Sequence, residues 1–132
     1  MQQIALATAL MVLMSACATQ TSGLARAQEA AQEMNLNTRF GRTGVVICRD
    51  LFHMLEVSTM AALGVQLLLA PSAMPARGFQ GDELSIERTV QLAVGSASTL
   101  LGMYVAYVNR VGSDDGLGFY GGSMLSDPDL GV

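Results

Sequence analysis

The sequence predicts an all-α fold in which a short polar helix precedes an apolar two-helix hairpin associated with a membrane, followed by a Gly-rich C-terminal tail. Hydrophobic residues make up 51% of the 132 residues and charged residues only 14%, against roughly 25% charged in an average soluble domain. Two long segments are almost wholly apolar, and one of them has no charged residue over twenty positions. These observations favour helices that seek lipid.

The charge pattern excludes one class of partner. The chain has a net charge of −4, contains no lysine, and carries seven arginines scattered singly along the sequence. Proteins that bind nucleic acid need a dense basic surface to displace counterions from the phosphates. We therefore expect no nucleic-acid partner, and 132 residues leave room for one small domain.

The apolar start of the chain suggests export. Residues 4–14 (IALATALMVLM) are eleven apolar or small residues, which suits the core of a signal peptide and is too short for a stable span. The run ends in Ser15, Ala16 and Cys17. Here the sequence resembles bacterial lipoprotein precursors, whose lipobox places a branched apolar residue and two small residues before a cysteine.

This resemblance implies that residues 1–16 are a signal peptide and that Cys17 becomes the lipid-modified first residue of the mature protein. Two departures from the family pattern are visible: Met14 stands where leucine is usual, and no charged residue precedes Arg26. The lipid would anchor an N-terminal segment over 17–43. An uncleaved apolar helix with an unmodified thiol is the alternative.

The rest of the chain is predicted to be mainly helical. Residues 23–40 are rich in Ala, Gln and Glu, which predicts a short polar-faced helix that serves as a solvated stalk or a docking surface. Residues 44–110 are predicted to form the apolar hairpin, with helices over 45–70 and 89–108 separated by a connector rich in proline and glycine. The second of these segments has the length that a bilayer requires.

The first apolar helix would carry a narrow polar stripe of Arg49, His53 and Glu56 on one face. A histidine beside a carboxylate can take part in acid–base catalysis or bind a metal ion. The stripe contains the one histidine of the chain, so we expect no metal and no cofactor. We interpret it as structural, with an ion pair between Arg49 and Glu56 or a polar latch against another subunit. The neighbouring Cys48 is interpreted as an inert, buried thiol.

The second apolar segment places small and polar residues on one helical face, within roughly 60° of one another. Such residues let two helix backbones approach closely and hydrogen-bond, so we predict a helix–helix seam within the hairpin or between subunits. A chance occurrence in a segment rich in small residues is the alternative. The seam residues are Gln91, Gly95, Ser98, Gly102, Ala106 and Asn109.

Residues 111–132 contain six glycines and four aspartates, which predicts a flexible tail. Residues 116–121 read GLGFYG, a literal G-x-G-x-x-G. A dinucleotide-binding fold needs a strand before this motif, a helix after it and an acidic residue about 20 positions on. Only eleven residues follow, so we do not expect a nucleotide site.

These features predict a small, non-enzymatic, lipid-anchored protein of the bacterial cell envelope that acts as a structural or assembly subunit of a membrane complex. Membrane lipid and further copies of the chain, or a larger membrane complex, are the expected partners. A holin-like pore-forming protein is the alternative, in which the seam mediates oligomerisation. The hairpin could be embedded or form a compact soluble bundle, and the uncharged second segment favours embedding.

Overall fold

A computed structural model of the chain describes residues 25, 29, 35–81 and 83–129. Strands and helices alternate along this part of the chain, so the all-α prediction is wrong and the fold is mixed α/β. In chain order the elements are β1 (Asn35–Thr38), β2 (Gly41–Val45), the 3₁₀ helix η1 (Cys48–Phe52), α2 (Met54–Ala62), β3 (Leu67–Ser72), β4 (Phe79–Gln80), β5 (Glu83–Leu84), α3 (Ser85–Leu101), β6 (Tyr104–Asn109), β7 (Val111–Asp114), β8 (Leu117–Tyr120) and β9 (Met124–Ser126).

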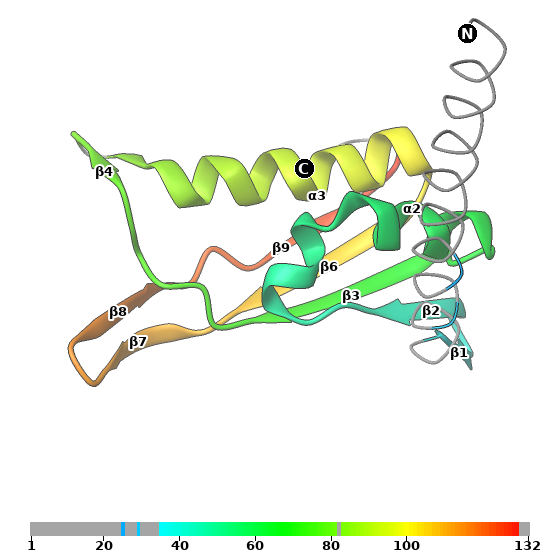
Figure 1. Cartoon of the computed structure of the whole chain (residues 1–132), viewed down its shortest axis with the longest axis horizontal. Helices are drawn as coiled ribbons and strands as arrows, with labels where there is room; N and C mark the ends of the chain where they lie inside the picture. The colour runs from blue at the N-terminus through cyan, green and yellow to red at the C-terminus, as the bar shows by residue number, and fades with distance from the viewer. Residues whose placement is uncertain (1–24, 26–28, 30–34, 82, 130–132) are drawn as a thin grey trace, which may run out of the picture.

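Five of the strands form the main sheet, in the order β1-β2-β3-β6-β9. The three inner strands β2, β3 and β6 are parallel, whereas β1 and β9 pair antiparallel with their neighbours. Parallel neighbours need crossover connections. The crossovers here pass through η1 and α2, and then through α3, all on one side of the sheet (Figure 1). The hairpin β7–β8 projects beyond the end of β6 (Figure 1).

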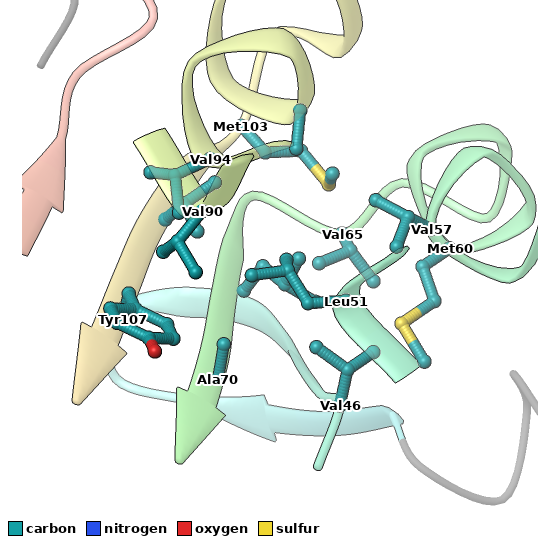
Figure 2. Close-up of a cluster of buried hydrophobic side chains, with 13 residues drawn as sticks. Val46, Leu51, Val57, Met60, Val65, Ala70, Val90, Val94, Met103 and Tyr107 are labelled. Atoms are coloured by element: carbon teal, nitrogen blue, oxygen red, sulfur yellow. The ribbon is translucent and has the colours of Figure 1, made fainter. Parts of the chain in front are cut away.

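The hydrophobic core lies between the sheet and these helices. Figure 2 shows side chains of η1, α2 and α3 converging on those of β3 and β6. Burying side chains of this kind stabilises a fold by roughly 1.5–3 kcal/mol each, so the core is the main source of stability. Its buried residues are Val46, Leu51, Val57, Met60, Val65, Leu68, Ala70, Val90, Val94, Ala97, Met103, Val105 and Tyr107.

The sequence-predicted helix over 89–108 is split into a helix and a strand. Helix α3 buries Val90, Val94 and Ala97, the spacing of one helical face. It ends because Gly102 adopts a left-handed conformation with φ of 69°, which glycine tolerates and which terminates many helices. The following residues then alternate between buried and exposed as strand β6.

The sequence-predicted helix over 45–70 is also wrong. The segment contains the end of β2, the helices η1 and α2, and most of β3. The apolar run that begins at Leu67 is strand β3, in which residues buried against the helices alternate with exposed but uncharged ones. A strand that is uncharged on both sides forms a continuous apolar run, and this property made the segment resemble an apolar helix.

The membrane hairpin is likewise corrected. Of the helices in the described ranges, none has the length and hydropathy needed to cross a bilayer. In place of a flexible tail, residues 111–129 form the hairpin β7–β8 and strand β9, which joins the main sheet.

The predicted signal peptide and Cys17 lie outside the described residues. Of the predicted polar helix over 23–40, Ala25 and Glu29 are helical, but residues 35–38 form strand β1.

Candidate active site

The carboxyl ends of the three parallel strands meet at one edge of the sheet, where ligands commonly bind in α/β folds. The register places Leu69 beside Ala106 and Ser72 beside Asn109, while the amide of Val46 donates to the Leu69 carbonyl at 2.9 Å. Residues that follow β2 therefore lie beside the second half of β3. We call this region the carboxyl edge.

Cys48 occupies the turn between β2 and η1 at this edge. Its φ is 52°, a left-handed conformation that costs a side-chain-bearing residue roughly 1–2 kcal/mol. Such strain persists where the surrounding structure enforces it and clusters at functional sites. A strand–turn–helix geometry of this kind presents the nucleophile of α/β-hydrolases. The thiol is half-buried and forms no disulfide.

Two reciprocal hydrogen bonds hold this turn. The Ile47 amide donates to the Asp50 carboxylate at 3.2 Å, and the Asp50 amide donates to the Ile47 carbonyl at 3.1 Å. The pair closes a loop around Cys48. Because both bonds join the residues on either side of it, they fix the left-handed conformation of Cys48.

A tyrosine pair lies at the carboxyl edge. The Tyr107 and Tyr120 hydroxyl oxygens lie 3.5 Å apart, and Figure 2 shows the Tyr107 hydroxyl pointing away from Val90 and Val94. Burial raises the pKa of Tyr107, and this effect outweighs the lowering by its hydrogen bonds with Tyr120 and Ser72.

The second tyrosine of this pair links the edge to α3. Burial raises the pKa of Tyr120 well above its usual range, as do its hydrogen bond with Tyr107 and the carboxylate of Glu87. Both phenols are therefore neutral at pH 7. The two hydroxyl groups thus form one polar pair at this edge.

Asn109 fastens two loops to this edge. Its side-chain oxygen accepts from the Met74 amide at 2.7 Å, and its side-chain nitrogen donates to the Gly121 carbonyl at 2.8 Å. The Asn109 amide donates to the Ser123 hydroxyl at 3.0 Å. Since the side chain is buried, these bonds are shielded from water and hold the segments after β3 and β8 in place.

The polar stripe predicted on one helix is spread over two short helices and their junction. Arg49 lies on η1, is exposed, and forms no ion pair with any described residue, so its predicted ion pair with Glu56 is not formed. His53 Nδ1 instead lies 3.7 Å from Glu56 Oε1. One potential ligand atom each from Asp50, His53 and Glu56 lies within 4.8 Å of the others. Among the described residues, these three form the one group of side chains that could bind a metal ion together.

The six residues of the predicted seam do not share a helix. Gln91, Gly95 and Ser98 lie on α3, Gly102 ends it, and the remaining two lie on β6. The seam as a face of one long helix is therefore not formed. Of the six residues, Ser98 is buried in the core, and Asn109 hydrogen-bonds the loop after β3 at the carboxyl edge.

With this geometry established, the comparison with known sequences is decisive. The sequence model of the carbon–nitrogen hydrolase family matches residues 11–132. The chain belongs to the carbon–nitrogen hydrolase family. The match begins inside the apolar run that suggested a signal peptide and includes Cys17. The identification as a lipoprotein precursor is therefore wrong.

Individual relatives agree with this family. A glutamine-dependent NAD(+) synthetase of Xanthomonas campestris pv. campestris (strain 8004) is 35% identical over 91 residues, which are 67% of this chain and 15% of the synthetase. A glutamine-dependent NAD+ synthetase from Acinetobacter baumannii shares the fold with a TM-score of 0.62 at 24% identity, over 72% of this chain and 17% of its own.

An amidase structure gives chemical detail. In a variant of the amidase from Nesterenkonia sp. AN1, the acetamide moiety of fluoroacetamide has added covalently at the active-site cysteine. This amidase is 30% identical with a TM-score of 0.60, and the match covers 74% of this chain and 36% of the amidase. The chain thus spans well under half the length of each of these relatives.

These relatives correct the functional predictions. They are enzymes, so the prediction of a non-enzymatic structural subunit is wrong, and so is the holin-like alternative. The prediction of a membrane-anchored envelope protein is wrong as well, because it was based on the lipoprotein resemblance and on the apolar hairpin, and both are overturned.

Sequence reasoning missed the functional meaning of Cys48 and the roles of Tyr107, Tyr120 and Glu87. One signal was available: Cys48 directly follows a β-branched run and precedes the charged pair Arg49–Asp50, as expected for a strand that ends at a functional turn. The tyrosines carry no local signal, because Tyr107 reaches the edge through the parallel pairing of β3 with β6 and Tyr120 through the antiparallel pairing of β7 with β8.

Proposed function

We propose that the chain carries the nucleophile of a hydrolase for primary carboxamides, and that this nucleophile is the Cys48 thiol. The observation that carries the proposal is the left-handed φ of 52° at Cys48, on the strand–helix turn at the carboxyl edge. Membership of the carbon–nitrogen hydrolase family supports it. The adduct at the active-site cysteine of the Nesterenkonia amidase supports the choice of a cysteine.

The reaction follows from thiol chemistry. The Cys48 sulfur attacks the carbonyl carbon of the amide, the carbon–nitrogen bond breaks, and the thiol proton leaves with the nitrogen as ammonia. A thioester with Cys48 remains. Water then adds to the thioester carbonyl, which releases the carboxylic acid and returns the proton to the Cys48 sulfur.

The carboxyl edge provides a polar wall for this reaction. Tyr107 and Tyr120 are neutral hydroxyl groups at pH 7, because burial raises the pKa of both. They can donate hydrogen bonds to a substrate but are poor bases. The attack also requires a general base to remove the proton of the Cys48 thiol.

Two relatives suggest two substrates of one chemical class. Glutamine-dependent synthetases and an amidase are both similar to this chain, and both names are consistent with cleavage of a primary carboxamide. We take the carboxamide as the shared substrate class. Parallel assays with glutamine and with acetamide distinguish an amino-acid side chain from a simple amide.

The test measures ammonia released by the purified full-length chain from each substrate. We expect Cys48→Ser to lower the rate of ammonia release at least ~100-fold, because the serine hydroxyl is a far weaker nucleophile than a thiol at pH 7. The matched control Cys17→Ser should retain the parental rate. Ammonia release that survives Cys48→Ser would overturn the proposal. It would also be overturned if the parent released no ammonia from either substrate and its Cys48 did not react with fluoroacetamide.

A further inference from the structure

Asp50, His53 and Glu56 stand at every third position across the junction of η1 and α2. His53 lies between the two helices, ending η1 and beginning α2, and its amide donates to the Asp50 carbonyl at 2.9 Å. One potential ligand atom of each side chain lies within 4.8 Å of the other two. We call these three residues the junction cluster.

The change of helix type at this junction brings the three side chains together. In one continuous α-helix, Asp50 and Glu56 would point about 120° apart around the axis. A 3₁₀ helix has three residues per turn, so side chains three positions apart eclipse each other. Because η1 is a 3₁₀ helix, Asp50 lies on the same side as His53. The sequence interpreted as one α-helix therefore did not show Asp50 as a third donor.

This donor set suits a divalent transition-metal ion. Imidazole is a good ligand for zinc, copper and nickel, whereas magnesium and calcium prefer sites made of oxygen atoms alone. Ligand atoms on a tetrahedral zinc ion lie about 3.4 Å apart, because each bond is about 2.1 Å long. His53 Nδ1 and Glu56 Oε1 are 3.7 Å apart. Closing the whole cluster around an ion therefore needs side-chain movements of about 1 Å.

The charge around the junction cluster also favours a cation. Among the described residues, no arginine forms an ion pair with Asp50 or Glu56. The distance of 3.7 Å between His53 and Glu56 is too long for a hydrogen bond, so the side chains are not yet joined to one another. A simpler explanation is that the two carboxylates only stabilise the first turns of their helices. That explanation does not account for an imidazole between them.

We propose that the junction cluster binds a divalent transition-metal ion such as Zn²⁺ through one atom each of Asp50, His53 and Glu56. Because 56% of the His53 side chain and 30% of the Glu56 side chain are exposed, water can reach the ion and complete its coordination. The second oxygen of the Asp50 carboxylate can keep its bond to the Ile47 amide. The ion thus joins α2 to the turn that holds Cys48. This inference is independent of the proposed hydrolase activity, because it concerns binding and stability.

Calorimetric titration of the full chain with Zn²⁺ tests this inference. Thiolates also bind zinc, so the titrations use a chain that carries Cys17→Ser and Cys48→Ser. We expect one zinc ion per chain. His53→Gln and Glu56→Gln should each weaken zinc binding more than ~10-fold, because the loss of even an outer contact to a metal ligand costs 10–100-fold. The control Asp115→Asn removes an exposed carboxylate from the turn between β7 and β8 and should leave the affinity unchanged.

Two further readouts separate metal binding from a purely structural role. The imidazole resonances of His53, the one histidine of the chain, should shift or broaden in proton NMR spectra when Zn²⁺ is added. The melting temperature should rise by roughly 10 °C at a zinc concentration of 100 times Kd, but not in His53→Gln.

Circular dichroism verifies that each variant is folded, and Glu56→Gln decides if His53→Gln fails to fold. The absence of zinc binding at millimolar Zn²⁺ overturns the inference. Binding that survives both His53→Gln and Glu56→Gln, or that is lost with Asp115→Asn, overturns it as well. A preference for Ca²⁺ over Zn²⁺ would also contradict it, because the imidazole would then not be a ligand.

Discussion

Replacing Asn109 with alanine should lower the free energy of unfolding by about 3 kcal/mol. The change removes the bonds to the Met74 amide at 2.7 Å and the Gly121 carbonyl at 2.8 Å. A hydrogen bond contributes about 1 kcal/mol net, and each buried group left without a partner costs about 1–3 kcal/mol. The Asn109 side chain is buried, so water cannot easily replace these bonds.

Urea denaturation followed by circular dichroism measures this loss. We expect the midpoint to fall while the slope of free energy against urea stays constant, since the folded state keeps its surface area. Asn37→Ala is the matched control, because Asn37 is exposed on β1, and it should change stability by less than ~0.5 kcal/mol. A loss below ~1 kcal/mol for Asn109→Ala would refute the argument that this side chain holds the two loops.

Three further predictions follow from the same structure. Because the folded-state pKa of Tyr120 is raised above the ordinary 10.0, unfolding should become easier as pH rises above about 10, where the unfolded chain loses its proton first; Tyr120→Phe should flatten this dependence in urea titrations between about pH 9 and 12. Gly102→Ala should cost about 1 kcal/mol, because φ is 69° and space around the new methyl is open; a loss under ~0.3 kcal/mol would show that the helix ends otherwise. Leu51→Ala should cost about 3 kcal/mol, whereas Leu100→Ala on the exposed side of α3 should cost under ~0.5 kcal/mol, and equal losses would contradict the assigned core.

The sequence indicated the helical nature of α2 and α3 but not their lengths. Both helices overlap the predicted ranges 45–70 and 89–108, because amphipathic spacing is visible locally. The strands beside them were missed because short apolar runs can be buried strands or buried helix segments, and periodicity alone does not separate them. Gly102 was interpreted as a packing residue, although a glycine after an apolar helix is equally a stop signal.

The candidate site was less predictable for a physical reason. The strain at Cys48 results from the hydrogen bonds between Ile47 and Asp50 and from the end of β2, none of which has a sequence signature without the strand. Tyr107 and Asn109 reach the same edge only through the parallel pairing of β3 with β6. A sequence interpreted as two helices places these residues far from Cys48, so no site could be assembled from it.

Mass spectrometry after exposure to fluoroacetamide tests the central claim, that Cys48 is an activated nucleophile, most directly. The full chain should gain a single acetamide group, and peptide mapping should place it on Cys48 and not on Cys17. The adduct should form equally in Cys17→Ser and be absent in Cys48→Ser. A modification found on Cys17, or a Cys48 that reacts no faster than the thiols of the urea-unfolded chain, would contradict the account.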